Sequence, residues 1–367
     1  MIKSKAKTKN FSSLSVGIDI SKDNFHACIA GLLPNKQRKV VSSTKFDNTA
    51  TGFEKFLTWV SYHIGSYEQK PEFLMEASGV YHENLAFYLY EQDERVVIVL
   101  GNHSKAFMKS EGIKTKNDKI DAKGLAFMSL VSDRRAWKPI SPILQQIRTQ
   151  TRHRAGLQKE LTRMRNRLHA LNHSHRPDKL VIKQLKVAIK LLEKQDEQII
   201  ESLQKIVKED KEFEQKLETV MSIPGIGFIS AITVIAETNG FELFTSLKQL
   251  NSFAGYDVVE NQSGKHQGNT KISKKGNSHI RRILYFPAFT AVKQENVFKQ
   301  LYQRIYEKTK VKMKAYTAVQ RKLLCTMYTL WKKEEEFKDK QNKENKENKE
   351  NKQNFVEEQI ALLHEII

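Results

Sequence analysis

The sequence predicts a mixed α/β domain followed by a region built mainly of helices, and three observations support this. Residues 13–47 hold apolar stretches of strand length, two of them joined by a tight turn at Lys22-Asp23. Residues 51–100 then alternate between helical and strand-like patterns, which is typical of a layered α/β fold with a mixed sheet. Residues 147–217 show long polar-apolar periodicity with Pro177 as the one proline, which indicates two long helices.

The first domain is expected at residues 15–145, after a basic leader at residues 1–14. Its strands are predicted from a meander, "SLSVGIDIS", "NFHACIAGL" and "KVVSSTKFDN", and from two buried runs, "PEFLMEAS" and "RVVIVLG". Its helices are predicted from the amphipathic segments "TGFEKFLTWVSYHI", "YHENLAFYLYEQD" and "NDKIDAKGLAFMSLVSD".

The rest of the chain divides by composition and period. Residues 146–217 predict an antiparallel coiled-coil arm that turns around "SHRPDK", and residues 218–333 predict a mostly helical domain. Residues 334–353 are of low complexity and are expected to form a disordered linker. Residues 354–367 are expected to form a short amphipathic helix whose apolar face docks on the protein or on a partner.

The charge balance predicts a polyanionic partner. Lys and Arg number 62 and Asp and Glu 42, giving a net charge of +20 and a pI near 9.6, so nucleic acid is the first candidate. No apolar run approaches the roughly 18 residues of a membrane span, and the basic start lacks the apolar core of a signal peptide. We therefore expect a cytoplasmic protein without a membrane partner. The two cysteines lie far apart, which argues against a disulfide framework or a zinc site.

Four acidic residues from three distant segments form a candidate metal site. Asp19 lies in an apolar strand, Glu76 ends another strand, and Asp118 and Asp121 share one face of a helix. Hard oxygen ligands suit Mg²⁺ or Mn²⁺, and a pair of such ions can clamp the reacting oxygens of a phosphodiester. Taken one by one, the helix acids are more often solvated charges, and Glu76 could cap the segment that follows it.

Basic residues near these acids and in the predicted arm are candidate phosphate contacts. Four lysines surround the helix acids: Lys114, Lys116, Lys119 and Lys123. Six arginines crowd the first arm helix: Arg148, Arg152, Arg154, Arg163, Arg165 and Arg167. Any single arginine is more often part of a solvated helix face, but the density of arginines over one helix favours phosphate contact. Any one of the lysines could equally be merely exposed.

Two segments of the third region also predict phosphate contact. In "SIPGIGFISAITVIAE", Gly225 and Gly227 resemble a helix-hairpin-helix turn whose backbone amides approach a phosphate; a tight turn in the core is equally compatible. The loop at residues 253–286 holds serines beside cations that would stabilise the charge of an attacked phosphate. Chemistry alone does not choose among Ser263, Ser273 and Ser278. The basic candidates around them are Lys265, Lys274, Lys275, Arg281 and Arg282.

The segments "GIDIS", "EASG", "NDKIDA", "IPGIG" and "SGKHQGNTKISKKGN" occur in this order, and together they resemble the DEDD transposases of the insertion-sequence one-ten group, which includes Piv-type DNA invertases. The resemblance covers residues 15–330 and implies a RuvC-like (RNase H-like) domain, a coiled-coil arm and a C-terminal transposase domain. By motif it makes Asp19, Glu76, Asp118 and Asp121 the acidic tetrad and Ser263 the nucleophile. Tyr256 and Val258 depart from the leucine and proline usual in this group.

The resemblance also implies a reaction and its partners. Serine attack on DNA would give a covalent phosphoserine, assisted by Mg²⁺ or Mn²⁺ at the tetrad. The partners would be the element ends, the target DNA and a structured guide RNA, in dimers and tetramers whose protomers share the tetrad and the serine. Two other hypotheses stay open: a RuvC-like nuclease or Holliday-junction resolvase that uses activated water, and a non-catalytic nucleic-acid-binding protein. The inverting and transposing branches are equally compatible with the sequence.

Overall fold

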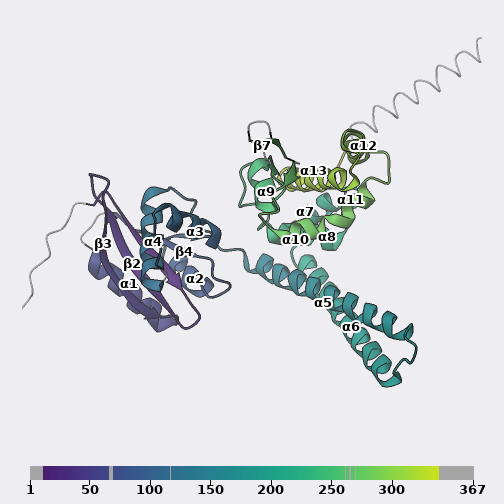
Figure 1. The fold of residues 1–367 in the computed structure, drawn as a ribbon, viewed down its shortest axis with the longest axis horizontal. Coiled ribbons are helices and arrows are strands. Elements are labelled where there is room, and N and C mark those ends of the chain that lie inside the picture. Colours follow the sequence, from purple (N-terminus) through teal and green to yellow (C-terminus); the bar gives the residue numbers. More distant parts are fainter. Residues whose placement is uncertain are drawn as a thin grey trace, which may run out of the picture. The chain divides into compact units, whose positions relative to one another are not determined.

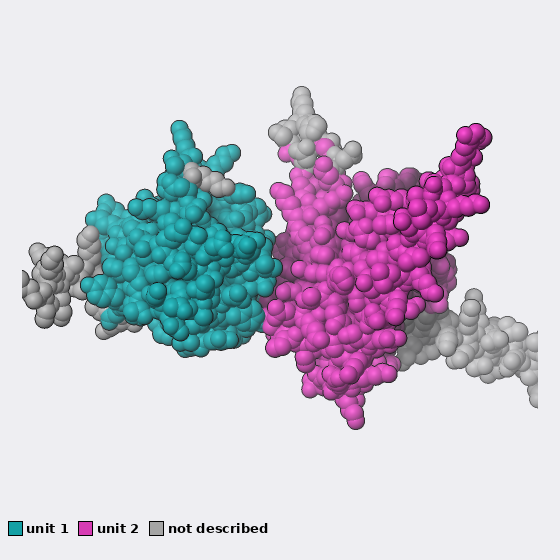
Figure 2. Space-filling model, turned by 90° about the horizontal axis from the view of Figure 1, so that it is seen from below, with its two compact units in different colours: residues 1–139 teal, residues 140–367 magenta. Residues whose placement is uncertain are grey.

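The computed structural model describes residues 11–65, 69–115, 117–260, 262–263, 266–268 and 270–338. The chain forms two compact units, residues 1–139 and residues 140–367, which Figure 2 shows in separate colours. Most of the predicted leader, most of the predicted linker and the whole predicted C-terminal helix lie outside the described residues, as do Lys116 and Lys265.

The first unit is built on a five-stranded mixed sheet with the order β3-β2-β1-β4-β5 (Figure 1). The strands are β1 (Ser13–Ile20), β2 (Asn24–Leu32), β3 (Arg38–Asp47), β4 (Glu72–Glu76) and β5 (Arg95–Val99). The first three form an antiparallel meander, while β4 runs parallel to β1 and β5 runs parallel to β4. This arrangement confirms the predicted mixed α/β domain.

Helices pack on the two faces of this sheet. They are α1 (Ala50–Ile64), α2 (Glu83–Glu91), α3 (Gly101–Ser110) and α4 (Asp118–Val131). Side chains alternate along β1, so Val16 and Ile18 pack with Phe56 of α1, whereas Ser15 lies on the opposite face and its Oγ donates to the carbonyl of Ala126 in α4 (2.8 Å). The patterns of α1, α2 and α4 are visible in the sequence, whereas α3 was not predicted.

Small residues let α4 lie directly on β1. A Cβ added at Gly17 would overlap backbone atoms of Ala122 and Ala126. Ala122 and Ala126 also pack with buried Cys28 of the neighbouring strand β2. The backbone of the helix therefore touches the sheet without large side chains between them, which fixes how far the helix start projects along the strand.

Gly17→Ala is expected to destabilise the first unit by about 1–3 kcal/mol, because the added methyl group overpacks a contact between two backbones. Denaturant unfolding monitored by circular dichroism measures the loss. Gly156→Ala is the matched control: its Cβ would enter open space on a helix, where alanine is the better helix former. Equal stability of the Gly17 variant and the wild type would contradict this packing.

The second unit is mostly helical. Its helices are α5 (Pro142–Asn172), α6 (Lys179–Lys208), α7 (Lys211–Met221), α8 (Phe228–Glu237), α9 (Leu247–Ala254), α10 (Ser278–Ile283), α11 (Tyr285–Ala291), α12 (Val297–Thr309) and α13 (Lys312–Lys333). The long helices α5 and α6 lie side by side and turn back at residues 173–178, where Asp178 caps α6 by accepting from the amide of Val181 (2.9 Å) (Figure 1). The periodic stretch ends in a separate helix, α7, instead of continuing α6 to residue 217.

The other helices of this unit share one core. Buried apolar residues of α7, α8 and α13 meet there, including Val220, Ile232 and Leu323. Four two-residue strands form two small ladders above it: β6 (Val258–Val259) pairs with β9 (Lys271–Ile272), and β7 (Gln262–Ser263) pairs with β8 (His266–Gln267). Within the described part of the chain, no helix has both the length and the apolar composition to cross a membrane.

Candidate functional site

Two of the predicted acids lie side by side at the carboxyl ends of neighbouring strands. Asp19 follows Ser15 and Gly17 at alternate positions of β1 and therefore lies on the face covered by α4. Glu76 follows Glu72 at alternate positions of β4, and Glu72 accepts a hydrogen bond from Ser129 of α4 (2.7 Å). The parallel register pairs the residues just before the two acids, so both acids emerge at one edge.

Helix α4 brings the other two acids to the same edge. Its contact with Gly17 lies near residues 122–126, and Asp19 is two residues further along β1, about 7 Å away. That length corresponds to roughly four to five helical residues toward the start of α4, the turn that holds Asp118 and Asp121. Independently, His26, the cross-strand partner of Asp19, has its Nδ1 3.9 Å from Oδ2 of Asp118.

Helix α3, which was not predicted from the sequence, holds Glu76 in place. Buried Ser104 of α3 donates a hydrogen bond from its Oγ to Oε2 of Glu76. A Cβ at Gly101 would lie 2.5 Å from Oε1 of Glu76, so glycine leaves space for the carboxylate. Ser104 and His26 are thus site residues that the sequence did not reveal, since a serine in a polar segment and a histidine in a strand carry no distinctive pattern.

The four acids offer the type of donor that a divalent ion prefers, and the elements that carry them meet at one edge of the sheet. They supply carboxylate oxygens on one edge of the sheet, the ligands that Mg²⁺ and Mn²⁺ prefer. Across the described residues, no three acidic, histidine or cysteine side chains are close enough to ligate one ion together. Asp118 is well exposed, with 64% of its side chain accessible, so it can change rotamer without disturbing the core.

The second unit presents Ser263 on a narrow antiparallel ladder. The β6–β9 pair forms the base, and further out along the chain the backbone of Ser263, on β7, pairs with that of His266. Ser273 lies back at the base, where its amide donates to the carbonyl of Asp257 (2.8 Å), and Ser278 begins α10. Of the three serines, Ser263 is the one that lies on the outer pair of strands, β7 and β8.

A buried carboxylate anchors the helix that follows this ladder. Glu237, only 3% exposed, accepts two hydrogen bonds from Arg152 of α5 (2.7 and 2.8 Å). It also accepts one from Asn277 (2.6 Å), the N-cap of α10. Burial alone would raise the pKa of Glu237, but these hydrogen bonds outweigh burial and hold its pKa below the ordinary value. Arg152, a predicted phosphate contact, is therefore engaged in joining α5 to α10.

Glu237→Gln is expected to lower the free energy of unfolding by about 1–3 kcal/mol at neutral pH, because it removes the charge from these hydrogen bonds. A lowered folded-state pKa stabilises the fold above the unfolded-state pKa, and this contribution is lost as pH falls through the folded pKa. The stability gap between wild type and variant should therefore shrink in acid. Denaturant unfolding from pH 7 down to about pH 3 tests this, with exposed Glu197→Gln as the control. A gap that stays constant with pH would contradict it.

Other arginines of α5 are also engaged within the protein. Arg154 pairs with buried Asp196 (3.0 Å) and Arg165 with Glu193 (2.7 Å), both on α6, so they hold the two long helices together. Arg163 pairs with Glu160 one turn earlier (2.8 Å). Two further predicted phosphate contacts interact within the protein: Arg148, and Arg281, which donates to the carbonyl of Ala254 (2.6 Å). The side chains of four others are exposed: Lys119, Arg167, Lys274 and Lys275.

A basic groove runs between α5, α8 and α10. It encloses about 680 Å³, and Lys159, Arg163 and Arg282 line it beside Phe286, whose side chain is 76% exposed. Gly225 of the predicted phosphate-binding turn packs against α11, since a Cβ there would lie 2.6 Å from the carbonyl oxygen of Pro287. Gly227 is the N-cap of α8 and has open space around it.

Comparison with known proteins matches both parts of the chain to one family. Residues 16–177 match the transposase family model for the DEDD domain of IS110, and residues 217–303 match the model of the transposase IS116/IS110/IS902 family. The pilin gene-inverting proteins of Moraxella bovis and Moraxella lacunata are each 27% identical over 331 residues, which is 89% of this chain and 98% of theirs. The transposase for insertion sequence element IS1111A of Coxiella burnetii is 34% identical over 67 residues, 18% of each chain.

These matches follow the order of the motifs and include the strands and the helix that carry the four acids. The match to the gene-inverting proteins also extends over nearly their whole length. The chain therefore belongs to the IS110 family of transposases, enzymes that recombine DNA.

Proposed function

We propose that this protein cuts and rejoins the DNA of an insertion sequence with Ser263 as nucleophile and with Mg²⁺ or Mn²⁺ at a RuvC-like acidic site. The observation that carries the proposal is the convergence of the four acids at one edge of the sheet, two from strand ends and two from the first turn of α4. The order of the mixed sheet supports a RuvC-like (RNase H-like) domain.

The acids and the serine have separate roles. Asp19, Glu76, Asp118 and Asp121 would hold the divalent ion, which stabilises negative charge on the phosphate when it is bound. Oγ of Ser263 forms a bond to phosphorus as the bond from phosphorus to the sugar oxygen breaks; the serine proton goes to solvent and the sugar leaves as a hydroxyl. Attack by a hydroxyl of the new strand reverses these steps, so the strand is rejoined without net hydrolysis.

Nucleic-acid contacts belong to the second unit in this proposal. The groove of Lys159, Arg163 and Arg282 would bind phosphates, and exposed Phe286 offers a surface on which a base can stack. A structured guide RNA would use the same kind of surface, because base pairing then reads the sequence while the protein binds backbone and shape.

The proposed organisation is a catalytic domain at residues 15–145, a coiled-coil arm at 146–217 and a transposase domain at 218–333. The acids lie in one compact unit and Ser263 in the other. The proposed assembly is a homodimer or homotetramer in which different protomers complete one site. The gene-inverting relatives support DNA inversion as one outcome of the same chemistry.

A second candidate is a RuvC-like metal-dependent nuclease or Holliday-junction resolvase. The observation that favours it is that all four acids lie within the first unit, so hydrolysis by activated water would not need the serine ladder.

Trapping of the covalent intermediate separates the two candidates. The purified protein is incubated with Mg²⁺, DNA carrying the element junction, and RNA transcribed from the element ends, and is then denatured on a gel. A protein–DNA adduct that survives denaturation is the expected result. Cleaved DNA without an adduct would instead favour the nuclease.

A further inference from the structure

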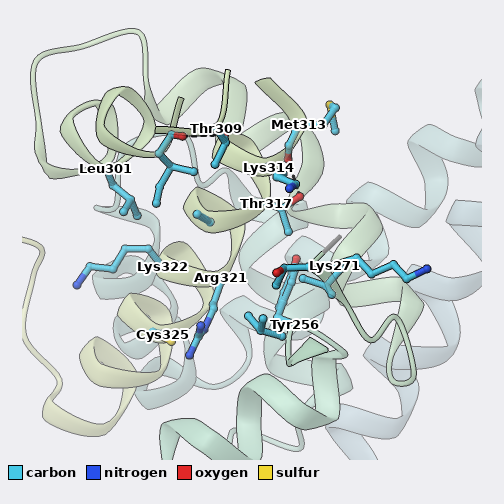
Figure 3. A pocket seen from close by; sticks show the side chains of 15 residues that line it. Tyr256, Lys271, Leu301, Thr309, Met313, Lys314, Thr317, Arg321, Lys322 and Cys325 are labelled. Carbon is cyan, nitrogen blue, oxygen red and sulfur yellow. Dashed lines mark hydrogen bonds between the residues drawn. The ribbon is translucent and has the colours of Figure 1, made fainter. Parts of the chain in front are cut away.

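The second unit carries an apolar groove with a basic rim, distinct from the groove described above. It encloses about 730 Å³ between α12, α13 and the β6–β9 pair (Figure 3). Its apolar lining includes Val258, Ile272, Leu301, Ile305 and Met313. Val258 is 53% exposed and Met313 47% exposed, so the apolar surface is open to solvent. An open apolar surface of this kind marks a binding site for an apolar partner.

The rim of this groove is positively charged. Lys271, Lys314, Arg321 and Lys322 line it, and none of the described lining residues is acidic. In Figure 3 the side chains of Lys271 and Lys322 extend on opposite sides of the pocket. The lining is predominantly apolar, which does not suit a nucleic-acid backbone. The partner that fits is an amphipathic peptide with acidic residues beside its apolar side chains.

The chain itself contains such a segment. Residues 355–367, "FVEEQIALLHEII", place Val356, Ile360, Leu363 and Ile367 at intervals of four, three and four, the spacing of one apolar helical face. The segment has three glutamates and neither lysine nor arginine, although the chain as a whole carries a charge of +20. It therefore matches the groove in both apolar character and charge.

The chain between α13 and residues 355–367 is long enough for this segment to reach the groove. The described residues end at Lys338, just after α13, and residues 339–354 precede the segment. In general, a linker of about 16 residues can span about 20–25 Å. The groove residue Lys322 lies on the same helix as Lys333, about 16 Å along its axis.

We propose that residues 355–367 bind in the groove between α12 and α13 of their own chain, with the apolar face inward and the glutamates near the rim lysines. The groove includes Val258 and Ile272, which pair at the base of the ladder that carries Ser263. The bound segment therefore supports the base of this ladder. In this way it affects the position of Ser263.

Alkylation of Cys325 in the full chain tests the proposal, because Cys325 lines the groove. Cys28 does not compete at neutral pH: it is fully buried, and burial raises the pKa of its thiol to about 11. The rate of reaction with N-ethylmaleimide is measured by mass spectrometry. Ile360→Asp with Leu363→Asp should raise the rate at Cys325 at least fivefold by releasing the segment, whereas Leu180→Asp, at an exposed position on α6, should leave it unchanged.

Charge reversal supplies a second, matched test. Lys314→Glu with Lys322→Glu should also raise the alkylation rate, and adding Glu357→Lys with Glu358→Lys to that variant should lower it again. Equal rates in the wild type and the Ile360/Leu363 variant would overturn the proposal. Protection that disappears on dilution of the wild type would also overturn it, because the segment would then come from a second copy.

Discussion

Ser263→Ala is expected to abolish the covalent protein–DNA adduct and to reduce strand exchange by about three orders of magnitude or more. Alanine lacks the hydroxyl that forms the bond to phosphorus, and no neighbouring water can give a protein-linked product. The backbone of Ser263 pairs with that of His266, and alanine keeps the backbone amide and carbonyl that such pairing uses. We therefore expect the variant to keep its fold and its affinity for DNA. Denaturing gels measure the adduct, and a binding titration at fixed salt measures the affinity.

The other serines of the loop region are matched controls for Ser263. Ser273 is tied to the ladder base by its backbone amide, and Ser278 is an exposed first residue of α10. Ser273→Ala and Ser278→Ala should retain the adduct. If Ser263→Ala cleaved DNA at the wild-type rate, the serine would have no part in the chemistry and hydrolysis by activated water would replace it.

The elements that the sequence predicted well are those whose pattern is local. Apolar runs such as "RVVIV" in β5 and the amphipathic spacing of α1 follow directly from burial, so they are visible without a structure. Asp19 stood out for a similar reason, because an acid among buried apolar neighbours is costly unless it has a partner or a function. The segment of α3 is polar, and Ser104 is its one buried residue, so no period marked it as a helix.

Roles that depend on partners distant in the sequence could not be predicted. In the sequence, Arg152 and Arg154 look like the other cations of a basic helix. Their partners are distant: Glu237 lies 85 residues from Arg152, and Asp196 lies 42 residues from Arg154. The density of arginine on α5 therefore reflects both packing of the second unit and the basic groove. Gly17 is a similar case. Only the structure shows that a side chain at this position would overlap the backbone of α4.

Asp19→Asn is expected to reduce DNA cleavage by about 10³-fold, since asparagine keeps the shape of the side chain but loses the charge that a divalent ion requires. Asp19 is fixed on β1 within the central part of the sheet, next to the end of β4, whereas Asp118 is exposed at a helix start. Asp19 is therefore held more firmly than Asp118, so a neighbouring acid cannot easily take its place. The cleavage rate at saturating DNA and Mg²⁺ measures the effect.

Thermal unfolding distinguishes a metal ligand from a structural acid. Carboxylates gathered at one edge repel one another without a cation, so Asp19→Asn should cost little stability when divalent ions are chelated. Added Mg²⁺ or Mn²⁺ should then raise the melting temperature of the wild type and not that of the variant, because an ion stabilises only the fold that binds it. Asp133→Asn is the control: its side chain is 97% exposed and its ion pair with Arg95 contributes little, so it should respond to the ion as the wild type does. A variant that melts well below the wild type in chelator and still gains stability from Mg²⁺ would instead make Asp19 a structural residue and remove it from the metal site.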